Sequence, residues 1–204
     1  MKDITGYFIY KETTAQQHED IAQPFTELFA KIMPAQVVEI GTSSGGLTLL
    51  LRDILDGLNL QTSLIRTYDV HDNNYIKYHV NDDTKIDVIK KNIFNHSYNN
   101  LLEEETQDIT NFIQQSGPTI VLCDGGSKKN EFNIFSKILK KGDIIMAHDY
   151  APTQEYFLDH INNKIWNWHE INDEDISQAC LENNLIPYMD AEFKSVVWVC
   201  KQKN

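Results

Sequence analysis

Carboxylate side chains and one imidazole follow several short apolar runs of this chain. Glu39, Asp69, Asp124 and the adjacent pair His148-Asp149 each stand at or near the end of such a run. Carboxylate oxygens accept hydrogen bonds from hydroxyl groups and bind hard cations such as Mg²⁺, whereas an imidazole binds softer metal ions or takes a proton near neutral pH. One acidic residue at such a point is often only a turn former or a helix cap, but repetition after successive runs favours a shared site.

A glycine-rich turn follows the first of these groups. The ten residues from Glu39 to Thr48 join an apolar strand pattern to an apolar helix pattern and contain Gly41, Gly45 and Gly46. Glycine permits a positive φ and a close ligand approach, and the first amides of a helix bind carboxylates or phosphates. A dinucleotide site would require G-x-G-x-x-G, and Ser43 replaces its second glycine. The spacing G-x-x-x-G-G therefore departs from the nicotinamide pattern.

The segments around these groups alternate between strand and helix patterns. Strands are predicted at 37–40, 63–68, 87–89, 119–123, 143–147 and 195–201. Helices are predicted at 21–32, 47–58, 101–115, 130–140, 153–162 and 173–183. This alternation predicts an α/β fold with a doubly wound, mainly parallel sheet, helices on both faces, and ligands beyond the carboxyl ends of the strands.

Some finer features are also predicted. We expect Asn99 or Asn100 to cap the helix 101–115. Lys140 is expected in the solvated last turn of the helix 130–140, where a cation suits the helix dipole. The polar stretch 71–83 is predicted to be a loop or a short exposed helix.

The composition predicts one globular domain. The chain has 204 residues, of which 41% are hydrophobic and 24% charged. We divide it into an N-terminal helical segment (1–33), a cofactor-binding core (34–150) and a C-terminal part with helices and the last strands (151–204). Three widely spaced cysteines in apolar contexts favour reduced thiols over disulfides or a zinc site, namely Cys123, Cys180 and Cys200.

Charge and hydropathy restrict the partners. A formal net charge of −12 disfavours binding to a phosphate backbone, so no nucleic-acid partner is expected. No apolar window is long enough for a membrane span, and the first four residues lead into no signal-peptide core. We therefore expect a cytoplasmic protein without a membrane partner, acting on a small molecule. The sequence leaves open whether it forms a homo-oligomer.

The segment Glu39 to Gly45 resembles the first motif of S-adenosylmethionine-dependent methyltransferases, in the E-x-G-x-x-x-G form of small-molecule O-methyltransferases. The longer context, from His18 through Gly46, is most similar to the cephalosporin hydroxylase and macrolide O-methyltransferase branch. The resemblance implies a Rossmann-like methyltransferase fold with S-adenosylmethionine as cofactor. The hydroxylase activity is not carried over, because no 2-His-1-carboxylate iron pattern is legible.

The resemblance also implies roles for individual residues. Asp69 would bind the ribose hydroxyls, with Asp72 as a competitor, and Asn92 would contact the adenine amino group. The full set of implied cofactor contacts is Glu39, Gly41, Thr42, Ser43, Gly45, Gly46, Asp69, Asn92 and Asp124.

The later strand ends are similar to those of metal-dependent catechol O-methyltransferases, in which Mg²⁺ is held by an aspartate after the fourth strand and an acid-amide pair after the fifth. This implies Asp124, His148 and Asp149 as ligands of Mg²⁺ or Mn²⁺. His148 departs from that pattern, so either the metal preference shifts towards Mn²⁺ or His148 is a base rather than a ligand. In the alternative, His148 only packs at the strand end and Asp149 caps the next helix.

The implied reaction is metal-assisted O-methylation of a small molecule. Lys128 is the candidate base, because the catechol enzymes place a lysine just after the fourth-strand aspartate; His148 is the rival base, and Lys128 could instead be a solvated loop lysine. The stretch 150–170, with Trp166 and Trp168, would wall the acceptor pocket together with 71–83. Saccharide or glycoside hydroxyls are our first choice of acceptor and a catechol-like phenol the second.

Two other classes remain open. A nicotinamide-dependent Rossmann oxidoreductase would need the glycine pattern that Ser43 and Ser44 interrupt. A non-catalytic S-adenosylmethionine-binding protein would keep the cofactor turn without a working Asp124 and Asp149.

Overall fold

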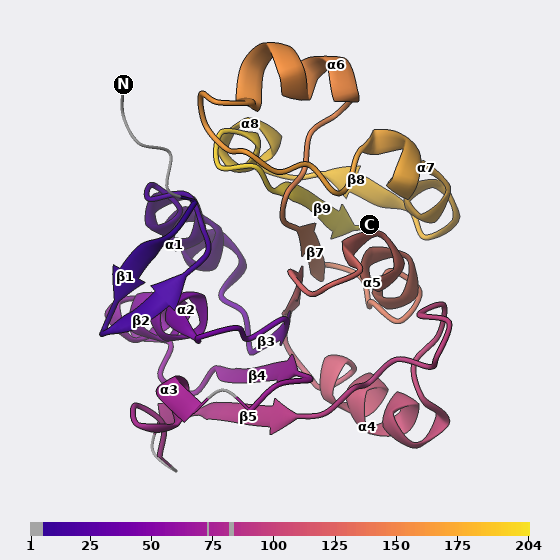
Figure 1. Ribbon diagram of the computed structural model, residues 1–204. Helices are drawn as coiled ribbons and strands as arrows, with labels where there is room; N and C mark the ends of the chain where they lie inside the picture. The colour runs from indigo at the N-terminus through magenta and orange to yellow at the C-terminus, as the bar shows by residue number, and fades with distance from the viewer. Residues whose placement is uncertain (1–5, 73, 82–83) are drawn as a thin grey trace.

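The computed structural model describes residues 6–72, 74–81 and 84–204 (Figure 1). The first four residues, where no signal-peptide core was expected, lie outside the described residues. Residues 73, 82 and 83 of the polar stretch 71–83 also lie outside them. Among the described residues, no helix combines the length and apolar character that a bilayer span requires.

A seven-stranded sheet forms the centre of the described chain, in the order β5-β4-β3-β6-β7-β9-β8. Strand β9 runs antiparallel to both of its neighbours, and the pairings from β5 to β7 are all parallel. The predicted mainly parallel, doubly wound sheet is confirmed. The strands are β3 (Gln36–Ile40), β4 (Leu64–Asp69), β5 (Ile86–Lys90), β6 (Thr119–Cys123), β7 (Ile144–Ala147), β8 (Leu185–Pro187) and β9 (Val199–Lys203).

Helices cover both faces of this sheet. Successive side chains of a strand point to opposite faces, so Val37 packs with one helix layer and Val38 with the other. The two strands β3 and β6 are buried along their whole length, which for β6 is what its continuous apolar run predicts. The helices are α1 (Ala22–Ile32), α2 (Gly46–Gly57), α3 (Asn74–Lys77), α4 (Glu103–Ile113), α5 (Lys128–Phe135), α6 (Gln154–Tyr156), α7 (Asp173–Glu182) and α8 (Asp190–Lys194), and a π-helical turn, η2 (Phe157–Ile161), continues α6.

The segment 1–33 contains a β-hairpin that the sequence analysis missed. Strands β1 (Phe8–Tyr10) and β2 (Thr13–Ala15) pair antiparallel and lie beside α2 (Figure 1). The hairpin packs so closely that a Cβ at Gly46 would lie 2.6 Å from the backbone of Thr14. Strands of three residues are too short to give a period-two pattern, so the description of 1–33 as helical was incomplete.

Two predicted helix ends were wrong. α4 begins after Leu102 and has no side-chain cap, whereas Asn99, one of the two expected caps, bonds to Asn95. α5 ends at Phe135, five residues before Lys140. The Lys140 ammonium is not in a solvated helix end, because its Nζ donates to the Ile113 carbonyl at 2.6 Å and to Asp143 at 2.9 Å.

The last strand also begins later than predicted. Residues 195–197 turn out of α8, and Val197 has a φ of 59° that no strand residue adopts. β9 therefore starts at Val199, and the short edge strand β8 was not predicted at all. All three cysteines are free, as expected.

Candidate active site

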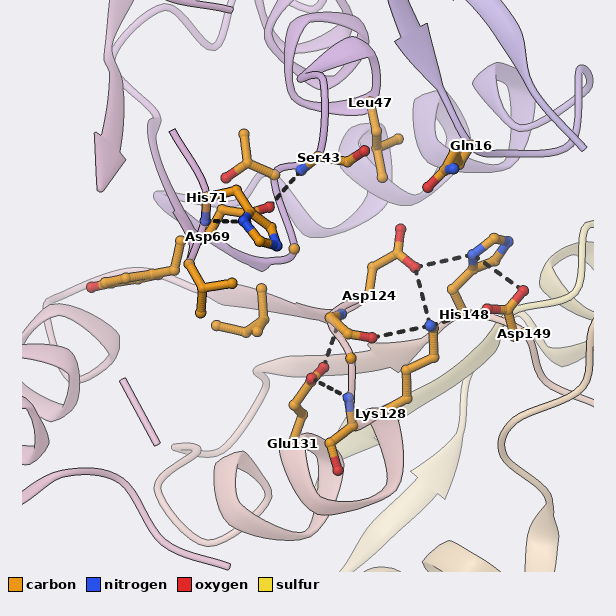
Figure 2. Close-up of a pocket in the computed structure, with 18 of the residues that line it drawn as sticks. Gln16, Ser43, Leu47, Asp69, His71, Asp124, Lys128, Glu131, His148 and Asp149 are labelled. Atoms are coloured by element: carbon orange, nitrogen blue, oxygen red, sulfur yellow. Dashed lines mark hydrogen bonds and ion pairs between the residues drawn. The ribbon is translucent and has the colours of Figure 1, made fainter. Parts of the chain in front are cut away.

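A cavity of about 1130 Å³ opens beyond the carboxyl ends of the parallel strands (Figure 2). Residues 41–44 line one end of it together with Asp69 and Asn92. Asp124, His148 and Asp149 line the other end. The strand ends that carry Asp69, Asp124 and His148-Asp149 therefore meet at one cavity, as expected for a doubly wound sheet. Glu39, which was expected with them, does not line it.

The glycine turn lies directly against the end of β6. Gly41 has a φ of 95°, and a Cβ at this position would be 2.3 Å from the carbonyl oxygen of Asp124. Only glycine fits such a close backbone approach. Gly41 therefore joins the cofactor turn to the strand that carries Asp124.

The Asp69 carboxylate holds two loops at the end of β4. The backbone N–H of Ser43 donates to its Oδ2 at 2.8 Å, and the N–H of His71 donates to its Oδ1 at 2.8 Å (Figure 2). Asp72, the competitor for the ribose, also lines the cavity, but its carboxylate is paired with Lys77. Asn92 is exposed at the cavity wall, and its Oδ1 accepts from the Phe94 N–H.

Three of the implied cofactor residues lie behind the cavity wall rather than in it. Gly45 packs against Ile76, and Gly46 packs against the N-terminal hairpin. Glu39 is fully buried, with Thr48 donating to its Oε2 at 2.5 Å. Burial raises the pKa of Glu39 to about 7. These residues can shape the turn, but the structure gives them no direct access to a ligand in this cavity.

Asp124, His148 and Asp149 form a compact set of candidate metal ligands. Their ligand atoms all lie within 4.8 Å of one another, and His148 Nδ1 is 3.0 Å from Asp124 Oδ1 and 3.6 Å from Asp149 Oδ1. Adjacent ligands of an octahedral ion with bonds of about 2.1 Å are about 3 Å apart. The donor set and its spacing therefore fit a divalent ion.

Outer contacts hold these ligands in place. The indole N–H of Trp166 donates to Asp149 Oδ1 at 2.5 Å. Burial opposes ionisation of Asp149, but the charges of His148 and Lys128 outweigh it and hold the pKa of Asp149 below its ordinary value. Asp149 has a φ of 55°, a conformation that Asp tolerates better than most residues. The alternative role of Asp149 as a helix cap has no support, since α6 is capped by Thr153.

The His148 ring is buried between two indoles. Its centroid is 4.9 Å from that of Trp198, in a stacked arrangement, and 5.2 Å from that of Trp166. Burial disfavours the imidazolium, yet the charges of Asp124 and Asp149 outweigh this effect and raise the pKa of His148. Its Nε2 is enclosed and has no hydrogen-bond partner among the described residues. An enclosed Nε2 favours a ligand through Nδ1 over a base that reaches the acceptor.

Lys128 is not a solvated loop lysine. It is only 7% exposed, and its Nζ lies 3.0 Å from Asp149 Oδ2, 2.9 Å from Glu170 Oε2 and 3.9 Å from Asp124 Oδ1. Figure 2 shows Lys128 pointing towards the acidic group at the ends of β6 and β7. Burial disfavours the ammonium, but the surrounding carboxylates outweigh it and raise the pKa of Lys128 above its ordinary value.

The loop that leads into α5 and Lys128 is held by a buried carboxylate that the sequence analysis missed. Glu131 accepts from the backbone N–H of Gly125 at 3.1 Å and from that of Ser127 at 3.0 Å. Burial raises the pKa of Glu131 to about 7. An acidic residue in the first turn of α5 was the available signal, because carboxylates there bind free amides.

The predicted acceptor walls are only partly brought to the cavity. Trp166, Trp168 and Glu170 line it, whereas Tyr156, Phe157 and His169 do not. Of the stretch 71–83, His71 and Asp72 are at the cavity wall.

No family model matches the chain, and a search of curated proteins gave no match. Solved structures do match. A CmcI structure described as Mg-SAM aligns with a TM-score of 0.61 at 13% identity, covering 96% of this chain and 76% of that one. A protein from Staphylococcus aureus assigned as a caffeoyl-CoA O-methyltransferase aligns with a TM-score of 0.54 at 12% identity, covering 89% and 82%. The MycE methyltransferase of the mycinamycin biosynthetic pathway, in complex with Mg, SAH and mycinamycin VI, aligns with a TM-score of 0.50 at 15% identity, covering 89% and 49%.

The chain has the Rossmann-like methyltransferase fold. The resemblance implied a fold of this kind, and most of the candidate groups gather at the edge of its sheet.

The N-terminal segment adds a residue to the methyltransferase fold that no motif predicted. Gln17 is 2% exposed, and its Nε2 donates to Asp124 Oδ2 at 2.6 Å. A lone glutamine between a hairpin and a helix has no recognisable pattern. Gln17 also lies outside the resemblance, which begins at the next residue, His18.

Proposed function

We propose that this chain is an S-adenosylmethionine-dependent methyltransferase that methylates a hydroxyl oxygen of a small molecule with the help of a divalent ion. One observation carries the proposal. A single cavity joins the glycine turn and Asp69 at one end to the ligand set of Asp124, His148 and Asp149 at the other. A cofactor methyl and a metal-bound hydroxyl could therefore be brought together in it.

The two groups would supply complementary chemistry. S-adenosylmethionine carries its methyl on a positively charged sulfur, and a divalent ion supplies the charge that orients an acceptor and lowers the pKa of its hydroxyl. In this proposal, residues 41–44 and Asp69 hold the cofactor, with Asn92 at the adenine. Asp124, His148 and Asp149 hold the ion, and the imidazole favours Mn²⁺ over Mg²⁺.

Lys128 is the residue that we assign to the acceptor's proton. Lys128 Nζ would take the hydroxyl proton as a neutral amine, while the methyl group would pass from the sulfur to the acceptor oxygen. The carboxylates of Asp124 and Asp149 favour the ammonium form, and that preference weakens when their charge is satisfied by a bound cation. Glu170 accepts from Lys128 at 2.9 Å and is 46% exposed, so it can pass the proton to solvent.

The acceptor end favours a substrate with a flat face and neighbouring hydroxyls. Trp168 is half exposed at the cavity rim, and its ring centroid lies 5.4 Å from that of Trp166. Indole faces stack on sugar rings and on flat phenols. A saccharide or glycoside with vicinal hydroxyls remains our first choice and a catechol-like phenol the second. The net charge of −12 argues against a nucleic-acid acceptor.

Calorimetric titration tests this function directly. The protein is titrated with S-adenosylmethionine, S-adenosylhomocysteine and NAD, each with and without Mg²⁺ or Mn²⁺. We expect both sulfur compounds to bind and NAD not to bind, and we expect Mn²⁺ to bind more tightly than Mg²⁺.

Binding of NAD alone, or of none of the three, would refute the proposal. Binding of S-adenosylmethionine without metal binding or methyl transfer would instead support the alternative of a non-catalytic S-adenosylmethionine-binding protein. Transfer of radiolabelled methyl to a panel of saccharides and catechols then identifies the acceptor class.

A further inference from the structure

Gln17 connects the N-terminal segment to the end of the cavity that Asp124, His148 and Asp149 line. Its side chain is buried and bonded at both ends. The amide Nε2 donates to Asp124 Oδ2 at 2.6 Å, and the amide Oε1 accepts from the indole N–H of Trp198 at 2.8 Å. A buried amide with both ends bonded has a single preferred orientation.

The chemistry of the two partners fixes that orientation. An indole N–H can only donate, so the carbonyl oxygen of Gln17 must face Trp198. The amide NH₂ must then face Asp124, and an ionised carboxylate can only accept. Trp198 therefore decides which end of Gln17 meets the candidate ligand.

The two oxygens of Asp124 are divided between different partners. Oδ2 accepts from Gln17, while Oδ1 faces His148 Nδ1 at 3.0 Å and Lys128 Nζ at 3.9 Å. Without the amide, the carboxylate could rotate and offer either oxygen. Gln17 thus directs Oδ1 towards the other candidate ligands.

The same indole also supports His148. Trp198 is fully buried and stacks on the imidazole, with ring centroids 4.9 Å apart and an interplanar angle of 27°. One side chain therefore orients both a ligand ring directly and a ligand carboxylate through Gln17. Outer contacts of this kind fix the direction of metal ligands and tune metal affinity.

We propose that Gln17 is a positioning residue of the metal site, which sets the direction of Asp124 together with Trp198. The inference rests on the proposed function, because it requires Asp124 to bind the ion. The inference assigns the segment that follows the β1–β2 hairpin to the site, although the candidate ligands themselves, Asp124, His148 and Asp149, lie elsewhere in the chain.

The chain offers a matched control in Gln36. It is also buried, at 5% exposure, and its amide is also bonded at both ends, to Ser116 at 3.3 Å and Thr119 at 3.2 Å. It begins β3, at the opposite end of that strand from the cavity. Loss of its amide removes buried hydrogen bonds without touching the site.

The test measures Mn²⁺ affinity by electron paramagnetic resonance in the presence of S-adenosylhomocysteine. We expect Gln17→Met to weaken Mn²⁺ binding about 10- to 100-fold, as second-shell changes do, and to leave S-adenosylhomocysteine affinity within about threefold. Gln36→Met should leave Mn²⁺ affinity within about twofold. It should lower the midpoint of urea unfolding by about as much as Gln17→Met does. If Gln17→Met does not fold, Gln17→Asn replaces it, because the shorter amide cannot span both partners.

A second variant tests the link to Trp198. Trp198→Phe keeps a ring on His148 but removes the indole N–H, and we expect a loss in Mn²⁺ affinity of about 3- to 10-fold. The double variant with Gln17→Met should be no weaker than Gln17→Met alone, because both act through one chain of contacts. If the losses in Mn²⁺ affinity of the two single variants multiply in the double variant, the link between Gln17 and Trp198 is overturned.

Two outcomes separate this inference from the proposed function. Unchanged Mn²⁺ affinity in both Gln17 variants overturns the inference and leaves the proposed function standing. A wild-type protein that binds no Mn²⁺ overturns both, and its S-adenosylhomocysteine titration then shows whether cofactor binding survives.

Discussion

The two ends of the cavity are built in different ways. At the cofactor end, where we propose that S-adenosylmethionine binds, the cavity is lined by a continuous turn, residues 41–44, and by strand-end residues such as Asp69 that bond to its backbone amides. At the metal end, where we propose that the divalent ion binds, side chains come from distant segments, with Gln17 and Asp124 separated by 107 positions. Local backbone geometry dominates one end, and long-range side-chain contacts dominate the other.

This difference has a functional consequence. A backbone turn tolerates changes in side chains as long as its glycines remain, whereas a site built from side chains depends on each of them. We therefore expect the two ends to fail separately when single residues are changed. Asp149→Asn, Gly41→Ala and Asp69→Asn test that separation.

Asp149→Asn should have the largest effect and should act on the metal end alone. The variant keeps the backbone conformation, because Asn also tolerates a φ of 55°. Removing one charged ligand should lower metal-stimulated methyl transfer about a thousandfold. Affinity for S-adenosylmethionine, measured by calorimetry, should stay within about threefold.

Asp87→Asn, an exposed carboxylate of β5, is the control for that change. It should leave both metal-stimulated methyl transfer and the affinity for S-adenosylmethionine as in the wild type. An equal loss of cofactor affinity in Asp149→Asn would mean that Asp149 has a structural role and that the two ends are not separate.

Gly41→Ala should damage both ends, because Gly41 is where they touch. The new Cβ would lie 2.3 Å from the Asp124 carbonyl oxygen, at a φ of 95°. We expect a loss of about 2 to 4 kcal/mol in the free energy of unfolding, measured by urea titration. Binding of S-adenosylmethionine and of Mn²⁺ should weaken together.

Gly57→Ala provides the comparison, since a Cβ there meets no atom within 4 Å. Its free energy of unfolding should change by less than about 1 kcal/mol. A Gly41→Ala protein that binds Mn²⁺ normally would show that the turn does not support Asp124.

Asp69→Asn should weaken the cofactor end alone. One of its two acceptor oxygens becomes an NH₂ group that repels the amide of Ser43 or His71 and cannot accept from a ribose hydroxyl. We expect affinity for S-adenosylmethionine to fall about 10- to 50-fold, with Mn²⁺ affinity unchanged. The affinity of Asp72→Asn for S-adenosylmethionine should stay within about twofold of the wild-type value. If Asp72→Asn lost more affinity than Asp69→Asn, the ribose role would belong to Asp72.

Glu39→Gln should have the smallest effect, on stability and its pH dependence. The folded-state pKa of Glu39, about 7, lies above its ordinary value of 4.5. Its contribution is therefore fully present below about pH 4.5 and is lost as the pH rises through 7. Glutamine stays neutral throughout, so the variant should be more stable than the wild type at pH 8 and not at pH 4.5. Urea titrations at both pH values measure this, and an equal difference at both would exclude ionisation of Glu39 as the cause.

The fold could be predicted from the sequence where the patterns were local. The apolar runs of β3 and β6 and the glycine turn between β3 and α2 identified the parallel sheet and its ligand edge. Patterns failed where the chain reverses without a signal, as at Val197, which ends a helical turn with a φ of 59°. They also failed for the three-residue strands of the hairpin, which are stabilised by packing on α2 rather than by their own periodicity.

The candidate site, too, could be predicted where the signal was local and not where it depended on distant segments. Asp69, Asp124, His148 and Asp149 were placed correctly at one cavity because strand ends of a parallel sheet meet at one edge. Their roles remain predictions. The surroundings of Lys128 could not be predicted, because Glu170 comes from a segment 42 positions away. Gln17 could not be predicted either, since nothing local distinguishes a buried glutamine.

The bond between Gln17 and Trp198 has a consequence for the order of folding. It joins residues 181 positions apart and depends on Trp198, which directly precedes β9. Closing so long a loop is slow, because its entropy must be lost before the contact forms. During refolding, the cofactor turn can therefore form before the oriented Asp124 does. We expect affinity for S-adenosylhomocysteine to recover ahead of affinity for Mn²⁺, so that competence for catalysis is acquired last.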